Sequence, residues 1–261
     1  MSLQRRFALL TILSCTGALL HAATLAPLNE KCRIGLSEDT GKFSLHIDRG
    51  DCPAERHCES SFSNEGFSRF TGILQTDLSQ EGARLTATLT AEAGAFTCTG
   101  TVHTRELTGD AVFTPDPTFI DRMAQMGFNG FTAEKLQAYA FINVESAFAR
   151  SLQQAGIRGI TTDNLIALRI FNIDPAYAKS FTDLGYEQPD AAKLIALKVQ
   201  KVDADEVRQL RDLGYQPTLD ELIQVRIFHI TPDFIHRMQD RGLKNLTIAK
   251  LVQIRIFKLA E

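Results

Sequence analysis

The residues of this chain best suited to covalent or metal chemistry are cysteines and histidines near its N-terminus. Besides Cys15, the sequence has four cysteines, all within the first hundred residues: Cys32, Cys52, Cys58 and Cys98. In an exported chain, an even number predicts two disulfides, for which three pairings are possible. Zinc is the alternative, because His57 precedes Cys58 and His46 lies nearby, but the sequence has no C-x-x-C pair. We therefore expect disulfides and no metal site.

Motifs specific enough to identify a reaction are absent from the sequence. There is no G-x-S-x-G, no P-loop, no G-x-G-x-x-G and no H-E-x-x-H. The enzymatic hypothesis that is left places a site at His46, Asp48 and His57. We rank it behind two non-enzymatic hypotheses, and we expect no catalytic residue and no cofactor.

Four basic residues recur every 28 or 29 residues and are the best indication of a binding site: Arg169, Lys198, Arg226 and Arg255. If successive segments stack, these residues form a stripe that would attract carboxylates, phosphates or sugar acids. The alternative is a solvated edge that pairs with an acidic column of similar period: Asp183, Asp212 and Asp240. Residues 116–261 contain 18 acidic and 18 basic residues, and this balance favours ion pairing over anion binding.

The basic residues belong to a longer repeat that is marked by glycine. Intervals of 29, 29, 29 and 28 residues separate Gly127, Gly156, Gly185, Gly214 and Gly242. A period between about 20 and 50 residues is typical of stacked repeat architectures. Apolar helical segments flank each glycine, so we expect it to end a helix with positive φ. The pattern predicts five helix pairs over residues 116–259, stacked as a short α-solenoid.

Two further positions recur within these repeats. Eight residues before the glycine, the fourth repeat has Glu206, whereas the others have an aromatic residue: Phe119, Phe148, Tyr177 and Phe234. The second helix of each pair carries the densest apolar set, which includes Phe141, Ile170, Val199, Ile227 and Ile256. Helices of about ten residues are unstable alone in water, so we expect stacking to bury these faces.

Residues 27–113 predict a small antiparallel β module. Apolar and polar residues alternate as they do in half-buried strands over 43–47, 85–89 and 96–102, with another strand at 111–113. We expect a turn at Leu107–Asp110 and irregular structure from Asp48 to Asn64. A module of this size has a small core, which disulfides would reinforce. Two prolines in residues 114–118 predict a hinge, giving an α+β chain of two modules.

Residues 1–22 have the features of an export signal. Arg5 and Arg6 precede an apolar stretch, Phe7–Leu20, that is too short to span a bilayer. Small residues follow, and we expect cleavage between residues 22 and 26. Cys15 leaves a lipid anchor as an alternative to simple cleavage. Because no later segment is apolar enough to cross a membrane, we expect the mature chain in the periplasm or outside a bacterial cell.

The order of the motifs resembles a known bacterial module of unknown role. The resemblance rests on three stretches and covers roughly residues 85–259: Glu92–Gly100, Val112–Pro117 and Leu165–Phe171. That module forms the extracytoplasmic C-terminal part of BlaR-type antirepressor membrane metallopeptidases and also occurs in stand-alone exported proteins. This chain lacks the multi-spanning domain and zinc motif of those proteases, so the resemblance implies no protease activity. Family members usually have an aromatic residue where Cys98 stands.

These features favour an exported, non-enzymatic protein-interaction or scaffold module of the bacterial envelope, which binds an unidentified protein through its stacked repeats. The resemblance implies the alternative, an extracytoplasmic sensor of a ligand or of cell-wall stress, and an enzyme is the distant third. A net charge of −3 provides no basic field for nucleic acid. The content of 44% hydrophobic and 23% charged residues is that of a globular protein.

Overall fold

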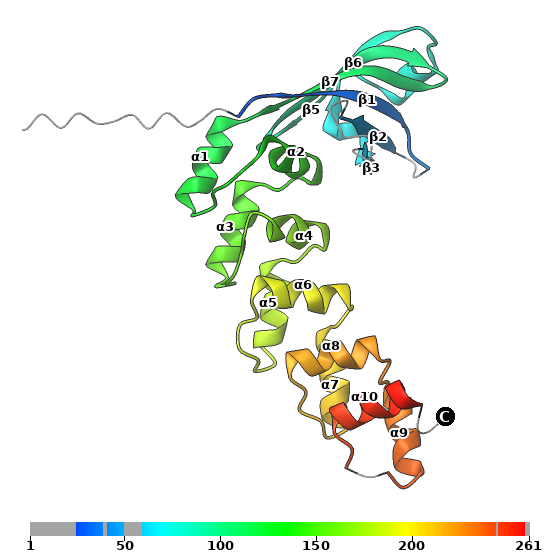
Figure 1. Cartoon of the computed structure of the whole chain (residues 1–261), viewed down its shortest axis with the longest axis vertical. Helices are drawn as coiled ribbons and strands as arrows, with labels where there is room; N and C mark the ends of the chain where they lie inside the picture. Colours follow the sequence, from blue (N-terminus) through cyan, green and yellow to red (C-terminus); the bar gives the residue numbers. More distant parts are fainter. Residues whose placement is uncertain (1–24, 39–40, 50–58, 244, 259–261) are drawn as a thin grey trace, which may run out of the picture.

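The computed structural model describes residues 25–38, 41–49, 59–243 and 245–258. In this part of the chain an antiparallel β-sheet is followed by ten α-helices, which confirms the expected two-module α+β fold (Figure 1). The sheet lies at one end of an elongated molecule, and the helix pairs extend from it toward the C-terminus (Figure 1). Among these helices, none is both long and apolar enough to cross a membrane. The expected signal peptide and Cys15 lie outside the described residues.

The sheet has seven strands in the described residues, in the order β3-β2-β1-β7-β6-β5-β4. Their bounds are β1 Leu28–Leu36, β2 Lys42–Asp48, β3 Glu59–Gly66, β4 Phe70–Thr71, β5 Arg84–Ala91, β6 Gly94–His103 and β7 Glu106–Pro115. Two short 3₁₀ helices accompany β4: η1 Phe67–Arg69 and η2 Gln75–Ser79. The expectation of irregular structure up to Asn64 is wrong from Glu59 onward, where β3 pairs with β2.

The turn expected at Leu107–Asp110 is also wrong, because these residues lie inside β7. The chain reverses at Thr104 and Arg105, which have φ values of 50° and 64°. Gly109 instead faces Gly100 across the β6–β7 pair, and a Cβ on Gly109 would lie 2.0 Å from a backbone oxygen of β6. Glycine inside a strand marks a close approach of two backbones here.

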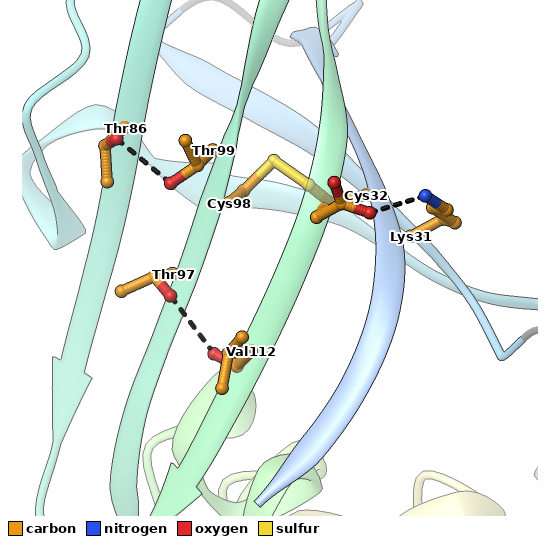
Figure 2. The surroundings of a disulfide bond; sticks show 8 residues. Lys31, Cys32, Thr86, Thr97, Cys98, Thr99 and Val112 are labelled. Atoms are coloured by element: carbon orange, nitrogen blue, oxygen red, sulfur yellow. Dashed lines mark hydrogen bonds and ion pairs between the residues drawn. A yellow bond between two sulfur atoms is a disulfide. The ribbon is translucent and has the colours of Figure 1, made fainter.

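A disulfide joins Cys32 on β1 to Cys98 on β6 and crosses β7, which lies between them (Figure 2). The two Cα atoms are 6.0 Å apart, whereas alternate strands of a flat sheet are about 9–10 Å apart. Gly109 of β7 lies opposite Cys32, so the sheet bends where β7 has no side chain. The other two cysteines, Cys52 and Cys58, lie outside the described residues, so the second expected disulfide stays a prediction.

The ten helices form five pairs (Figure 1). In each pair, the odd-numbered helix lies in one layer and the even-numbered helix lies in the other. Their bounds are α1 Pro117–Gln125, α2 Ala133–Ile142, α3 Ser146–Gln154, α4 Asn164–Ile170, α5 Pro175–Thr182, α6 Ala191–Val199, α7 Ala204–Asp212, α8 Leu219–Ile227, α9 Pro232–Asp240 and α10 Ile248–Phe257. The even-numbered helices contact one another in succession from α2 to α10. The side of these helices that exposes Ile170, Val199, Ile227 and Ile256 is called the even-helix face below.

The five recurrent glycines end the odd-numbered helices with φ values between 75° and 89°. In the first repeat, Gly127 donates its N–H to the carbonyl of Ala124, and Phe128 donates to Met123, both at 2.9 Å. The other four glycines make the same pair of hydrogen bonds, which defines a Schellman motif. Each glycine therefore turns the chain from one layer of helices to the other.

The even-numbered helices end in the same left-handed conformation, but with residues other than glycine. Their terminal residues have φ values between 50° and 57°: Asn143, Asn172, Lys201, His229 and Lys258. These residues recur every 28 or 29 positions, so their period was available in the sequence. Their types were not informative, since only asparagine among them is a familiar substitute for glycine at a helix end.

Apolar packing joins the first helix pair to the sheet. Helix α2 lies against β5, β6 and β7. The ring of Phe141 at the end of α2 contacts the ring of Phe96 on β6, with centroids 5.1 Å apart. Both side chains are fully or almost fully buried. The hydrophobic core therefore continues from the sheet into the repeats.

A buried polar triad joins the same two modules. Arg49, after β2, donates to Glu30 on β1 at 2.8 Å and to Gln137 on α2 at 3.1 Å. Gln137 in turn donates to the second carboxylate oxygen of Glu30 at 2.5 Å. Because each member of the triad binds the other two, the buried polar groups are satisfied. The link at residues 114–118, expected to be a hinge, thus joins modules that side chains also hold together.

Candidate functional site

The basic column, defined as Arg169, Lys198, Arg226 and Arg255, lies near the C-terminal ends of α4, α6, α8 and α10. Three of its members lie over the aromatic ring that precedes the glycine of the same repeat. Arg169 Cζ is 5.5 Å from the centroid of Phe148, Lys198 Nζ is 4.3 Å from that of Tyr177, and Arg255 Cζ is 4.0 Å from that of Phe234. Cation–π contacts of this kind therefore connect the two helices of a repeat.

The basic column also reaches back to the preceding repeat. Arg226 Nη2 donates to the carbonyl of Lys201 at 2.5 Å, and Arg255 Nη2 donates to that of His229 at 3.2 Å. Lys201 and His229 are the residues that end α6 and α8 in the left-handed conformation. A cation at the C-terminus of a helix is favourable because it meets unpaired carbonyls and the negative end of the dipole.

These contacts differ from the acidic pairing weighed in the sequence analysis. Asp183 pairs with Lys179, one turn earlier on its own helix α5. The members of the basic column instead contact rings, carbonyl oxygens and, in the fourth repeat, Glu206. The sequence shows both periods but does not show which faces of the two helices meet. The basic column thus links helices within and between repeats. Its binding of an anionic partner stays a prediction.

The fourth repeat replaces the ring with Glu206 on α7. Its Oε2 lies 3.2 Å from Nε of Arg226, and its side chain is only 16% exposed. Neither of these two buried atoms has a hydrogen-bond partner among the described residues. Burial, assisted by the nearby Asp203, raises the pKa of Glu206 to about 7, although Arg226 opposes the shift. The carboxyl of Glu206 therefore titrates close to neutral pH.

A cavity of about 470 Å³ opens beside this pair. It lies between the start of α7, the end of α8 and the start of α9, and its polar lining includes Asp203, Asp205, Glu206, Arg226 and His229. Cavities of this size are within the range of small-ligand sites. The cavity coincides with the one repeat in which the aromatic position is not aromatic.

An apolar column lies directly beside the basic column on the even-helix face. Its members each follow a basic residue in sequence and are 47–55% exposed: Ile170, Val199, Ile227 and Ile256. Phe171, directly after α4, and Phe257, the last residue of α10, are exposed as well. The expectation that stacking buries this position is therefore wrong in four of the five repeats.

The first repeat shows how the same position is covered. Phe141 is its equivalent there and is 1% exposed, because the chain's own sheet lies over α2. The sheet is at one end of the molecule and does not extend over the later pairs (Figure 1). The position that packs against the sheet on α2 is thus repeated on α4, α6, α8 and α10, where no part of the sheet covers it.

The β module brings together two of the three residues of the enzymatic hypothesis. A hollow of about 310 Å³ is lined by His46 and Asp48, next to the disulfide at Cys32, whereas His57 lies outside the described residues. Among the residues that the structure describes, no group of three or more His, Cys, Asp or Glu side chains is placed to hold a metal ion. Of the three residues in the hypothesis, the described part of the chain thus places His46 and Asp48 in this hollow.

Comparisons with known proteins add no assignment, because no protein-family model, curated protein or solved structure matches this chain. The resemblance to the module of BlaR-type metallopeptidases stays a prediction. The site must be interpreted from the contacts described above.

Proposed function

We propose that this protein is an exported, non-enzymatic interaction module that binds a polypeptide partner along the even-helix face. The apolar column carries this proposal. Four aliphatic side chains at equivalent positions are about half exposed, and the fifth equivalent, Phe141, is buried under the sheet. Clustered apolar surface of this kind is characteristic of interaction sites, whereas single exposed apolar residues are common on any surface.

The chemistry of the face defines the partner. The apolar column requires aliphatic or aromatic side chains that repeat along an elongated segment. The basic column borders it, so the segment should carry carboxylates beside its apolar residues. The same face already accepts a polypeptide in the first repeat, where β-strands lie over α2. A polypeptide partner would lie on the later even-numbered helices in the same way as the chain's own strands lie on α2.

Two observations support an exported location in the bacterial envelope. The Cys32–Cys98 disulfide persists most readily in an oxidising compartment. The basic and apolar segments at residues 5–20 have the order of an export signal. The proposal of a bacterial envelope also relies on the sequence resemblance described above.

Site-specific photocrosslinking tests the proposal. A photoreactive residue at Val199 or Ile227 should give a discrete crosslinked product in envelope extracts. The same residue at Leu74, which is 67% exposed on the sheet module, serves as the matched control and should give none. Equal products at both sites, or none at Val199 and Ile227, would contradict binding at the even-helix face.

Substitution of the apolar column provides the second arm. Changing Ile170, Ile227 and Ile256 together to Ser should abolish capture of the crosslinked partner, whereas Leu74→Ser should leave it unchanged. Circular dichroism should show that both variants keep their fold, since the changed side chains are at least about half exposed. Retention of the partner by the triple variant would refute the proposed surface.

A further inference from the structure

The fourth repeat departs from the others at one position with a clear structural role. Phe148, Tyr177 and Phe234 each place a ring beneath a member of the basic column. Glu206 holds this position in the fourth repeat, and the cation above it is Arg226. A glutamate side chain is smaller than an aromatic ring and is not flat. The fourth repeat therefore has no ring beneath Arg226, although Arg226, like Arg255, donates to a carbonyl at the end of the preceding even-numbered helix.

The cavity beside Glu206 has a mainly polar lining with some apolar surface. Leu210, Val225 and Ile230 line its wall, and each is only about 2% exposed, so the apolar surface that they offer to a ring is small. Arg226 contributes a guanidinium whose Nη2 is already bound to the carbonyl of Lys201. A ring held between this wall and the guanidinium would make the cation–π contact found in the neighbouring repeats.

The other acidic residues of the cavity are already engaged by the fold. Asp203 caps α7 and accepts the N–H of Glu206 at 2.9 Å, and Asp205 pairs with Arg208. The Oε2 atom of Glu206 is buried and ion-paired with Nε of Arg226 at 3.2 Å, but it accepts no hydrogen bond in the described part of the chain. Buried polar atoms rarely lack a partner, so an occupant of the cavity should offer a hydrogen-bond donor.

We propose that the fourth-repeat cavity binds an aromatic ring with a hydroxyl group, namely a tyrosine side chain of the bound polypeptide. The ring would lie against Arg226, as the rings of the other repeats lie against their own cations, and the hydroxyl would donate to Oε2 of Glu206. This inference rests on the proposed function for the source of the ring. The site itself is defined by the cavity and can be tested without the partner.

Titration with p-cresol, the side-chain analogue of tyrosine, tests the site on the full disulfide-bonded chain. Nitrogen-15 NMR should show saturable shifts at Arg226, Gln209 and His229. Toluene lacks the hydroxyl and should bind at least threefold more weakly. Stronger binding of n-butylamine than of p-cresol, with the same residues shifted, would overturn the proposal by showing that the cavity selects a cation.

Two variants test the origin of the site. Glu206→Phe supplies the ring from the chain itself and should weaken p-cresol binding at least tenfold while the protein stays folded. Tyr177→Glu removes the ring beneath Lys198 and should create a second p-cresol site in the third repeat. Unchanged affinity in Glu206→Phe would overturn the inference, as would the absence of any p-cresol shift in the unmodified protein.

The experiments separate this inference from the proposed function. Crosslinking through Val199 that survives Glu206→Phe at unchanged yield, together with failure of p-cresol to bind, would reject the tyrosine site and leave the even-helix face intact. Binding of p-cresol without any crosslinked partner would show a site for free phenols and reject the polypeptide as the source of the ring. Loss of both p-cresol and the partner in Glu206→Phe is the expected result.

Discussion

Replacing Lys201 with glycine should make the protein more stable. Lys201 ends α6 with a φ of 57°, in a conformation that costs a residue with a Cβ atom about 1–2 kcal/mol. Its structural role is carried by the backbone, since its N–H donates to the carbonyl of Lys198 at 3.0 Å and its own carbonyl accepts from Arg226. Lys201→Gly keeps both hydrogen bonds and removes the strained Cβ.

The expected gain is the relieved strain less the entropy that glycine adds to the unfolded chain. The second contribution is roughly 0.5–1 kcal/mol, so the free energy of unfolding should rise by about 1 kcal/mol or somewhat less. For a protein of this size, that corresponds to a Tm increase of about 2–4 °C. Urea denaturation followed by circular dichroism measures the change.

Gly214→Ala is the opposite substitution, and the same two contributions with reversed signs should destabilise the protein by about 1 kcal/mol or somewhat less. Gly214 has a φ of 88°, and a Cβ there would meet nothing within 4 Å. The loss would therefore come from the backbone conformation alone. Asn172→Gly is the matched control for Lys201→Gly, since asparagine tolerates this conformation and should gain less. A stability loss in Lys201→Gly, or no loss in Gly214→Ala, would refute this account of the helix ends.

Three further outcomes are expected. Gly109→Ala should destabilise more than Gly214→Ala in the same urea assay, because its Cβ would meet the backbone of β6 at 2.0 Å. Reducing Cys32–Cys98, which closes a 66-residue separation, should cost about 4 kcal/mol in denaturation with and without reductant. The pKa of Glu206 is about 7 in the folded protein, above its ordinary value of 4.5. Folding therefore favours the protonated carboxyl. The stability gained in this way is complete below pH 4.5 and is lost as the pH rises through 7. Glu206→Gln should remove this pH dependence, which amounts to at most about 3 kcal/mol in urea titrations at several pH values.

The repeat architecture could be predicted from the sequence because glycine has a specific physical role at a helix end. The period of Gly127 and its counterparts indicated both the five helix pairs and their turns. The ends of the even-numbered helices are harder to predict, because lysine has no preference for the left-handed conformation and histidine adopts it far less often than glycine does. Hydrogen bonds and packing fix these residues despite their propensity, and this information is not local.

The β module was predicted less completely, since glycine has more than one role in a strand. Gly109 indicated a turn in the sequence, but its absent side chain allows β6 and β7 to approach each other. Whether a glycine marks a turn or a close approach of two strands depends on the residue opposite it in the sheet. Gly109 lies opposite Gly100, so here it marks a close approach. The Cys32–Cys98 pairing follows from the same bend and could not be chosen among three possibilities without it.

The candidate site shows the same division between local and non-local information. Aromatic and basic residues both recur in the sequence, yet their contact depends on how the two helices of a pair cross. The sequence shows that Glu206 is an exception to the aromatic pattern, but only the structure shows that its partner is Arg226. A departure from a repeated pattern is therefore a useful signal of a site even when the pattern itself is structural.

Exposure of the apolar column follows from where the chain places its sheet. Helix periodicity predicts an apolar face but not what covers it, and Phe141 is buried only because the sheet lies at that end of the molecule. Phe141→Ala should therefore cost about 3–5 kcal/mol, as expected for a buried ring, whereas Ile227→Ala should cost far less. Ile227 is about half exposed beside Arg226, and this exposure is the observation on which the proposed polypeptide-binding face rests.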